Sequence, residues 1–300
     1  MPGDSWNDKG IEFEGPIERV GIMSKPNAPR AQEIVPGLID WLAQRGIESR
    51  IDEETAFYAG LKDFVPRERV PADTQLVIVL GGDGTLLSAA RCLEGRRIPL
   101  LAVNLGSLGF LTALTVEELY PQLERALKRE QRIGVRHMLR CRVERNGELV
   151  DSYEALNDAV ITKASLARMI DVAVHVDSHF VSNYKADGLI VSTPTGSTAY
   201  SLSAGGPIIF PTVGAVSITP ICPHMLTHRP VIVPAQSHIR LVNRAMDDDA
   251  WLTIDGQVGQ PLRNGDIVHC EKSEHDVYLI RPPKMLFFDV LREKLKWGER

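Results

Sequence analysis

The stretch Gln75-Leu-Val-Ile-Val-Leu-Gly-Gly-Asp-Gly-Thr85 decides the fold of the first part of this chain. Residues 76–80 are an uninterrupted apolar run rich in β-branched side chains, which is typical of a strand buried on both faces of a parallel sheet. Three glycines then surround Asp83, and residues 86–90 open an apolar pattern at helical spacing. A strand, a glycine turn and a helix form a unit whose backbone N–H groups and helix dipole bind phosphate. Taken alone, the turn is equally compatible with Asp83 as an ordinary N-cap.

The rhythm of strand and helix continues on both sides of this turn, with further strands expected at 17–23, 47–51 and 99–103. A helix that ends at Gly46 is expected between the first two, with Pro36-Gly37 inside it. Another is expected to begin at Thr115, where Glu118 completes a capping box. These alternating elements favour an α/β domain with a doubly wound parallel sheet. Ligands bind beyond the carboxyl ends of such strands, where 81–85 and 104–109 both fall.

From about residue 133 the apolar pattern changes to the alternation of strands. Asn146-Gly147 is a hairpin signal, and short strands are expected at 160–162, 170–176, 189–192, 208–210, 231–233, 239–242, 251–254 and 277–280. Many short strands with little helix between them predict an antiparallel β domain. Residues 287–297 return to helical spacing, and we expect this helix to dock on the first domain. The predicted α/β domain therefore comprises 1–134 and 285–300, and the all-β domain comprises 135–284.

The amino-acid composition excludes several classes of function. The 300 residues are 44% apolar and 24% charged, as in a soluble globular protein, and the net charge of -5 argues against a nucleic-acid or membrane-surface binder. The four cysteines lie far apart, without metal-ligand spacing, and the N-terminal residues lack the apolar core of a signal peptide. We expect a cytoplasmic protein.

A second glycine-rich stretch, Asp187 to Pro207, is dominated by hydroxylated residues and glycine from Ser192 onward. Such a loop offers many hydrogen-bonding groups and little steric bulk, as a binder of sugar hydroxyls and phosphates needs. We expect a short helix over 198–204 that is capped by Ser197 and directs its N-terminus at a ligand. The alternative is a flexible linker.

Asn157-Asp158, just before an expected strand, pairs an amide with a carboxylate, which together can bind vicinal ribose hydroxyls. By itself this is more often a turn dipeptide. Asp187 could likewise be part of an Asp-Gly turn or a carboxylate that binds a ribose or amide group. His224 is by default a structural histidine. Isolated basic residues such as Arg168 and Lys185 are most simply surface charges.

Several common motifs are missing from the sequence. There is neither a Walker-type Gly-Lys-Ser/Thr nor a dinucleotide GxGxxG, since Val103 is followed by Asn-Leu-Gly-Ser-Leu-Gly. No spacing of histidines or carboxylates predicts a dedicated metal site. A magnesium ion would arrive with a nucleoside triphosphate.

Gly81-Gly-Asp-Gly-Thr85 resembles the phosphate loop shared by NAD kinases, diacylglycerol and sphingosine kinases, and 6-phosphofructokinases. The segment Thr193-Pro-Thr-Gly-Ser-Thr-Ala-Tyr-Ser-Leu-Ser-Ala-Gly-Gly-Pro207 is more specific and resembles NAD kinases alone. The Asn157-Asp158 pair, Asp187-Gly188 and Gln257 in an Asp-Gly-Gln turn match that family too, as do Pro223-His224 and Arg229-Pro230. The resemblance covers the chain from about Ile17 to its end.

The resemblance implies transfer of the γ-phosphoryl group of ATP, with Mg²⁺, to the 2′-hydroxyl of the adenosine ribose of NAD, giving NADP, in a site between the two domains. It makes Asp83 the proton acceptor, with Gly81, Gly82, Gly84 and Thr85 on the ATP phosphates. His224 would support the site without touching substrate. The implied NAD contacts are Asp83, Gly84, Asn157, Asp158, Arg168, Lys185, Asp187, Thr195, Thr198, Ala199, Tyr200, Ser201, Leu202, Ser203 and Gln257.

Two other readings stay open from the sequence. A lipid kinase of the diacylglycerol type shares the glycine turn, although the hydroxyl-rich 192–206 loop is the wrong chemistry for an apolar acceptor. A non-catalytic NAD-binding sensor is the other, and the intact Asp83 argues against it. The family resemblance also implies a homodimer or homotetramer that assembles through the β domains, with no nucleic-acid or membrane partner.

Overall fold

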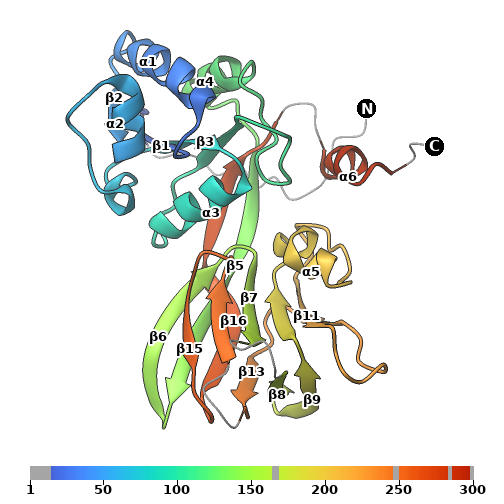
Figure 1. Ribbon diagram of the computed structural model, residues 1–300. Coiled ribbons are helices and arrows are strands. Elements are labelled where there is room, and N and C mark those ends of the chain that lie inside the picture. The colour runs from blue at the N-terminus through green and yellow to red at the C-terminus, as the bar shows by residue number, and fades with distance from the viewer. Residues whose placement is uncertain (1–14, 164–168, 246–249, 283–285, 298–300) are drawn as a thin grey trace. The chain divides into compact units, whose positions relative to one another are not determined.

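The computed structural model describes residues 15–163, 169–245, 250–282 and 286–297. The chain divides into two compact units, one formed by residues 1–135 and 277–300 and the other by 136–276. Figure 1 labels the elements. Two strands, β5 (Ile133–Arg145) and β16 (Ile267–Ile280), have residues in both units.

The first unit is built on a parallel sheet. Its strands lie in the order β2 (Glu48–Ile51), β1 (Arg19–Ser24), β3 (Leu76–Gly81), β4 (Leu100–Asn104), and the last residues of β16 pair in parallel with β4. All six residues of β3 are buried, as the unbroken apolar run requires. The predicted α/β sheet is confirmed.

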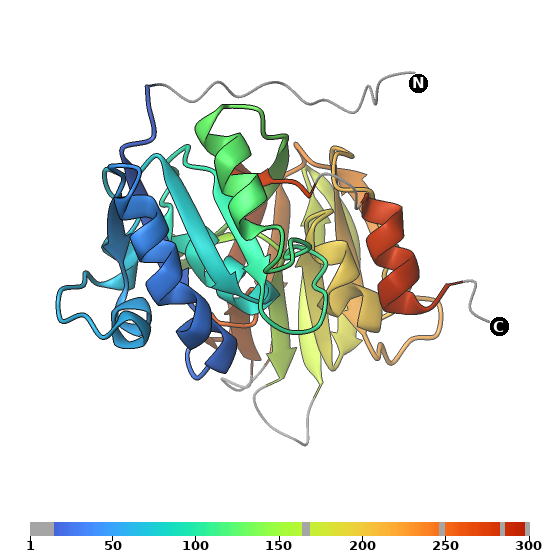
Figure 2. The same ribbon diagram turned by 90° about the horizontal axis from the view of Figure 1, so that it is seen from above.

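Helices cover both faces of this sheet. Figure 1 shows α1 (Pro29–Ala43) and α4 (Leu119–Leu127) above β1 and β3, and α3 (Asp83–Cys92) below them. Seen from above, α1 in blue and α4 in green lie on the same side of the strands (Figure 2). Alternate strand residues, Ile22 and Ile78 among them, join the apolar core formed with α1 and α4. This two-faced packing is the doubly wound arrangement that the sequence predicts.

Two short elements and a terminal helix complete the unit: α2 (Glu53–Ala59), the 3-10 turn η1 (Arg67–Arg69) and α6 (Phe287–Leu295). The α6 helix belongs to the first unit, where the Lys294 ammonium lies 5.8 Å from the centre of the Phe110 ring. The predicted return of the C-terminal helix to the α/β domain is confirmed.

The second unit is a pair of mostly antiparallel sheets. In one sheet, β16 pairs on one side with β13 (Ile239–Asn243), which pairs with β8 (Ile170–Val176), which in turn pairs with β9 (His179–Ala186). The β16 strand also pairs with β5, and β5 pairs with β6 (Glu148–Ala155). The other is six-stranded, in the order β12 (Val231–Pro234), β11 (Ala215–Ile221), β10 (Gly188–Ser192), β7 (Asp158–Lys163), β14 (Ala250–Ile254), β15 (Val258–Leu262). One apolar core draws buried residues from both sheets. The predicted antiparallel β domain is confirmed.

Three local predictions are wrong. Residues 208–210 are not a strand, because the backbone N–H of Ile209 donates to the Ser197 hydroxyl at 2.9 Å instead of joining a ladder. The Ser197 hydroxyl accepts that N–H and donates to the Pro194 carbonyl at 2.6 Å. It is therefore not the helix N-cap that the sequence predicted. The helix expected from Thr115 begins at Leu119, after a turn, although the Glu118 carboxylate does accept the Thr115 N–H.

Candidate functional site

The glycine turn joins the carboxyl end of β3 to the first turn of α3. Gly82 is the N-cap residue of α3, and Asp83 is its first residue. A side chain at Gly81 would place its Cβ 2.3 Å from the Thr85 hydroxyl oxygen, so the turn closes only with glycine there. The helix N-terminus carries partial positive charge at this edge of the sheet. The predicted phosphate-binding unit is therefore formed as a strand, a turn and a helix.

The Asp83 carboxylate is held by the loop that follows β4. Its Oδ1 accepts bonds from the backbone N–H groups of Leu111 (3.1 Å) and Thr112 (3.0 Å) and from the Thr112 hydroxyl (2.9 Å). Among the described residues, its Oδ2 accepts a bond only from the backbone N–H of Phe110, at 2.9 Å. Each oxygen of a carboxylate has about two acceptor sites, so Oδ2, with a single donor, keeps capacity for one more. Asp83 is half-buried, which leaves that oxygen within reach of a ligand.

Asn104 fixes the loop that holds Asp83. Its amide nitrogen donates to the carbonyls of Ser107 (2.9 Å) and Thr112 (3.0 Å), and its amide oxygen accepts the N–H of Gly106 at 2.7 Å. A Cβ at Gly109 would lie 2.2 Å from Asp83 Oδ1, so this position also requires glycine. The roles of Gly109 and Thr112 were missed from the sequence, although a polar, glycine-rich loop directly after a buried strand is a signal for them.

In the second unit, Asn157 and Asp158 lie at the start of β7 and are organised by Asp255. The Asp255 carboxylate accepts the backbone N–H groups of Leu156 (3.0 Å), Asn157 (2.7 Å) and Asp158 (3.1 Å). Both side chains are buried, and the amide oxygen of Asn157 has no hydrogen-bond partner among the residues that the structure describes. A buried acceptor without a partner is costly unless a ligand or water satisfies it. The pair is therefore a candidate binding feature, since a turn alone does not require a buried acceptor without a partner.

The glycine-rich 193–203 stretch packs directly on this pair. The Thr193 hydroxyl donates to the Leu156 carbonyl at 2.6 Å, and the Thr193 N–H donates to the Asn157 carbonyl at 2.9 Å. A Cβ at Gly196 would meet the backbone of Asn157 at 2.2–2.7 Å. The stretch forms a 3-10 turn, η2 (Gly196–Thr198), and one helical turn, α5 (Tyr200–Ser203). It is an ordered loop and not a linker.

Exposure differs along this loop. Thr195, Thr198 and Ser201 are buried, Ala199 and Leu202 are half-buried, and Tyr200 and Ser203 are exposed. The exposed residues and the unpartnered Asn157 oxygen leave a polar surface on which a ribose and a planar ring can be held by hydrogen bonds and ring contact. Gln257 belongs to the same region, because it follows Asp255 by two residues.

Lys185 and Asp187 lie at the other end of β10 from this cluster. In the β10–β7 pair, Ser192 stands opposite Asp158 and Gly188 opposite Thr162. At about 3.4 Å per residue, Asp187 is therefore roughly 17 Å from Asp158 along the strand. Asp187 forms an ion pair with Lys163 at 2.7 Å, Lys185 lies 3.7 Å from Asp171, and the His224 N–H donates to the Lys185 carbonyl. Within one chain, the structure does not bring these residues to the Asn157 cluster. Arg168 lies outside the described residues.

Asp158 is a buried carboxyl beside a second carboxyl. Burial raises the pKa of Asp158 to about 7, and the neighbouring negative charge of Asp255 contributes to the rise. The side chain is only 4% exposed, so solvent screens this effect little. Near neutral pH, Asp158 therefore exchanges its proton, and a ligand hydroxyl that donates to it favours the ionised form.

We expect this carboxyl to make stability depend on pH. The pKa of Asp158 is higher in the folded chain than the ordinary 3.8, so its stabilising contribution is complete below about pH 4 and is lost as pH rises through 7. The loss amounts to as much as about 4 kcal/mol. Urea unfolding from pH 5 to 8 should show a steeper fall for the wild-type chain than for Asp158→Asn. Parallel curves would contradict the assignment.

No helix within the described residues is long and apolar enough to span a membrane. No cluster of three or more histidine, cysteine, aspartate or glutamate side chains within the described ranges could hold a metal ion by itself.

Comparison with known proteins matches both units. A family model described as the ATP-NAD kinase N-terminal domain matches residues 20–131, and one described as the ATP-NAD kinase C-terminal domain matches residues 156–282. The chain is 62% identical over 284 residues to an NAD kinase of Solibacter usitatus (95% of this chain, 99% of the relative). It is 51% identical over 285 residues to an NAD kinase of Koribacter versatilis (95% of this chain, 100% of the relative).

Two solved structures of similar fold are also an NADH kinase and an NAD kinase. A yeast NADH kinase complexed with NADH superposes with a TM-score of 0.89 at 27% identity, covering 96% of this chain and 90% of that one. An NAD kinase from Archaeoglobus fulgidus in complex with ATP superposes with a TM-score of 0.74 at 26% identity, covering 91% of this chain and 98% of that one.

Proposed function

The chain belongs to the NAD kinase family, whose members transfer the γ-phosphoryl group of ATP to the 2′-hydroxyl of the adenosine ribose of NAD, and we propose that Asp83 is the carboxylate that accepts the proton of that hydroxyl. The observation that carries this proposal is the remaining acceptor capacity of Asp83 Oδ2 at a glycine turn formed for phosphate. The other oxygen is fully engaged by the 111–112 turn, so the substrate hydroxyl has one atom to approach.

The donor is held at the glycine turn. The backbone of Gly81, Gly82 and Gly84, the Thr85 hydroxyl and the positive end of α3 suit a chain of phosphates. We propose that Mg²⁺ arrives as part of the ATP substrate, as the family resemblance implies. It supplies charge neutralisation on the phosphates. The chain itself contributes position and orientation, which phosphoryl transfer needs more than covalent chemistry.

The acceptor is held by the second unit. We assign Asn157, Asp158 and residues 195–203 to the adenosine half of NAD, on the support of the unpartnered Asn157 oxygen and the ordered hydroxyl-rich loop. Asp158 accepts from a ribose hydroxyl as the carboxylate.

A carboxylate is too weak a base to ionise an alcohol fully. Asp83 therefore orients the 2′-hydroxyl and takes its proton late, as the oxygen attacks phosphorus and the bond to the leaving ADP breaks. The proton moves to Asp83 Oδ2, the phosphoryl group moves to the ribose oxygen, and ADP carries away the bridging electrons.

The proposal predicts that purified protein with NAD and Mg-ATP yields ADP and a 2′-phosphorylated dinucleotide in equal amounts. Coupled detection of ADP and of NADP measures both products. NADH and polyphosphate, each substituted in parallel, establish acceptor and donor preference. Diacylglycerol as acceptor tests the lipid kinase reading, which none of the relatives found supports. Tight NAD binding without any transfer would favour a sensor and contradict the proposal.

Lys185, Asp187, Gln257 and Arg168 remain proposed NAD contacts. The separation of the first two from Asp158 is consistent with their serving NAD bound to a second copy of the chain, in a cytoplasmic homodimer or homotetramer. Light scattering coupled to size exclusion tests this assembly, and an active monomer would contradict it.

A further inference from the structure

Lys25 stands next to the glycine turn. It directly follows β1, whose last residue, Ser24, is the register partner of Leu80 in β3. The Lys25 N–H donates to the Leu80 carbonyl at 2.8 Å, and a Cβ added at Gly81 would lie 3.1 Å from the Lys25 Cβ. Lys25 and the glycine turn (81–85) therefore lie side by side at the carboxyl edge of the parallel sheet.

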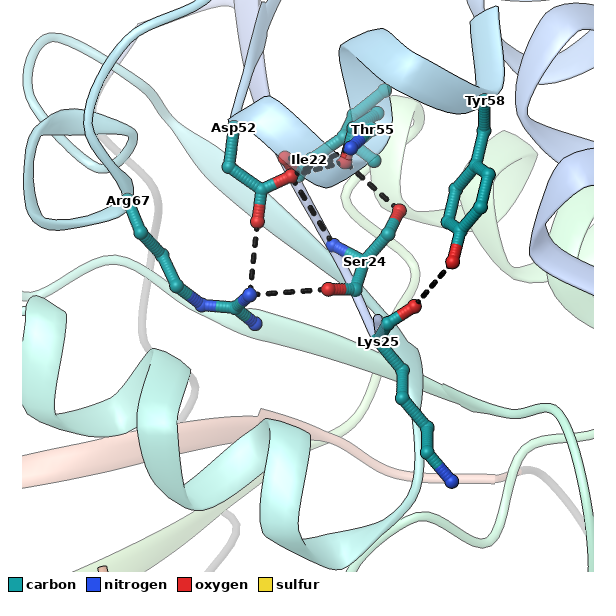
Figure 3. Close-up of polar contacts among 7 residues, drawn as sticks. All are labelled: Ile22, Ser24, Lys25, Asp52, Thr55, Tyr58 and Arg67. Atoms are coloured by element: carbon teal, nitrogen blue, oxygen red, sulfur yellow. Dashed lines mark hydrogen bonds and ion pairs between the residues drawn. The ribbon is translucent and has the colours of Figure 1, made fainter. Parts of the chain in front are cut away.

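A buried polar network fixes the backbone at this lysine. The Tyr58 hydroxyl donates to the Lys25 carbonyl at 2.8 Å and accepts the N–H of Ala28 at 2.9 Å. The Arg67 guanidinium donates to the Ser24 carbonyl at 3.0 Å. Figure 3 shows the Arg67 and Tyr58 contacts to the carbonyls of the adjacent residues Ser24 and Lys25.

The network is itself anchored by Asp52, which is 2% exposed. The Asp52 carboxylate lies 3.0 Å from the Arg67 guanidinium and caps α2 by accepting the Thr55 N–H at 3.0 Å. The hydroxyls of Ser24 and Thr55 hydrogen-bond at 2.8 Å. A backbone held by this many buried bonds fixes the direction in which the lysine side chain leaves the sheet.

The Lys25 side chain takes no part in the network. It is exposed, and no carboxylate among the described residues forms an ion pair with its ammonium. In Figure 3, the Lys25 side chain points away from the residues that form the network. The nearest acid of the turn, Asp83, is bonded to residues 110–112 instead. An unpaired cation beside the positive end of α3 is a site of positive potential that an anion fills.

We propose that Lys25 binds the phosphoryl chain of the donor at the glycine turn, with Tyr58 and Arg67 as positioning residues. The proposal rests on the donor site assigned above. The ligand chemistry is a run of linked phosphates, whether from ATP or from polyphosphate, and Lys25 acts on it as a point charge with three N–H donors.

The test is steady-state kinetics on Lys25→Gln. Removing one charge-assisted contact should raise KM for ATP about tenfold, while kcat and KM for NAD change little. Inorganic tripolyphosphate should inhibit against ATP, with a Ki that rises by the same factor in the variant. Lys25→Arg should recover most of the ATP affinity, and Tyr58→Phe should raise KM for ATP by a smaller factor because the backbone is loosened.

Lys128→Gln is the matched control. Lys128 is exposed at the end of α4, where Glu124 forms an ion pair with Arg45, which follows the far end of α1 from Lys25. Its loss should therefore leave every constant unchanged. Unchanged KM for ATP and unchanged tripolyphosphate inhibition in Lys25→Gln would overturn the proposal. If the wild-type chain phosphorylates NAD in that same assay, the failure concerns Lys25 alone and not the activity.

Discussion

Asp83→Asn is expected to lower kcat by at least about 100-fold and to leave the Kd for NAD within a few-fold of wild type. An amide cannot take the proton of the ribose hydroxyl, although it has nearly the size of the carboxylate. The measurement is single-turnover phosphate transfer together with NAD binding by calorimetry. Loss of NAD binding, with the fold intact, would make Asp83 a group that positions the ligand and not the base.

The same substitution also weakens the 109–112 turn. The amide NH₂ can accept no bond, so at least one of the backbone N–H groups now bonded to Asp83 loses its partner, at about 1–3 kcal/mol. Thr112→Val is the control for this effect, because it removes the hydroxyl bond to Asp83 Oδ1 and keeps the carboxylate. We expect Thr112→Val to lose stability and to keep kcat within about tenfold of wild type.

Gly196→Ala is expected to destabilise the second unit by at least about 2 kcal/mol and to abolish measurable NAD binding. Its Cβ would lie 2.2 Å from the Asn157 carbonyl oxygen and 2.7 Å from its Cα. These are backbone atoms, so the strain cannot be relieved by turning a side chain. The 193–198 turn must move away from Asn157, which separates the two parts of the proposed adenosine site.

Gly214→Ala controls for the loss of a glycine in the same unit. Nothing lies within 4 Å of the added Cβ at that position. We expect its free energy of urea unfolding to stay within about 0.5 kcal/mol of wild type and its NAD affinity to be unchanged. Similar behaviour of the two alanine variants would mean that the Gly196 turn does not support the binding site.

Sequence patterns predicted the parts of the fold that local chemistry determines. The buried run and the glycine turn became β3 and α3 as expected, because the apolar pattern and the glycines act over a few residues. The Asn146-Gly147 hairpin is confirmed, with φ of 53° and 83° in the left-handed region that such turns need. Pro36 did not end α1, since packing of that helix on the sheet overrides the local preference.

The missed elements were those whose stability comes from distant neighbours. The α2 helix is only seven residues long, and much of its support comes from Tyr58 and Asp52 bonding to the end of β1. The β11 strand contains Pro220, which locally argues against a strand, yet it pairs on both sides in the six-stranded sheet.

For the candidate site, too, the sequence predicted the residues in local patterns and missed those that act through distant contacts. The sequence pointed to Asp83, Asn157 and the hydroxyl-rich loop, because those residues stand in recognisable patterns. It did not reveal that Asp255 organises residues 156–158, nor that residues 110–112 bind Asp83, because each contact joins segments between 27 and 99 residues apart. Such contacts depend on strand order, which no local pattern encodes.

We propose above that the Asp83 carboxylate takes the proton of the adenosine 2′-hydroxyl of NAD. A crystal structure of the complex with NAD and a non-hydrolysable ATP analogue tests it most directly. We predict Asp83 Oδ2 within about 3 Å of the ribose 2′-oxygen, in line with the terminal phosphorus. A complex with both ligands bound and that oxygen about ten ångströms or more from Asp83 would contradict the account.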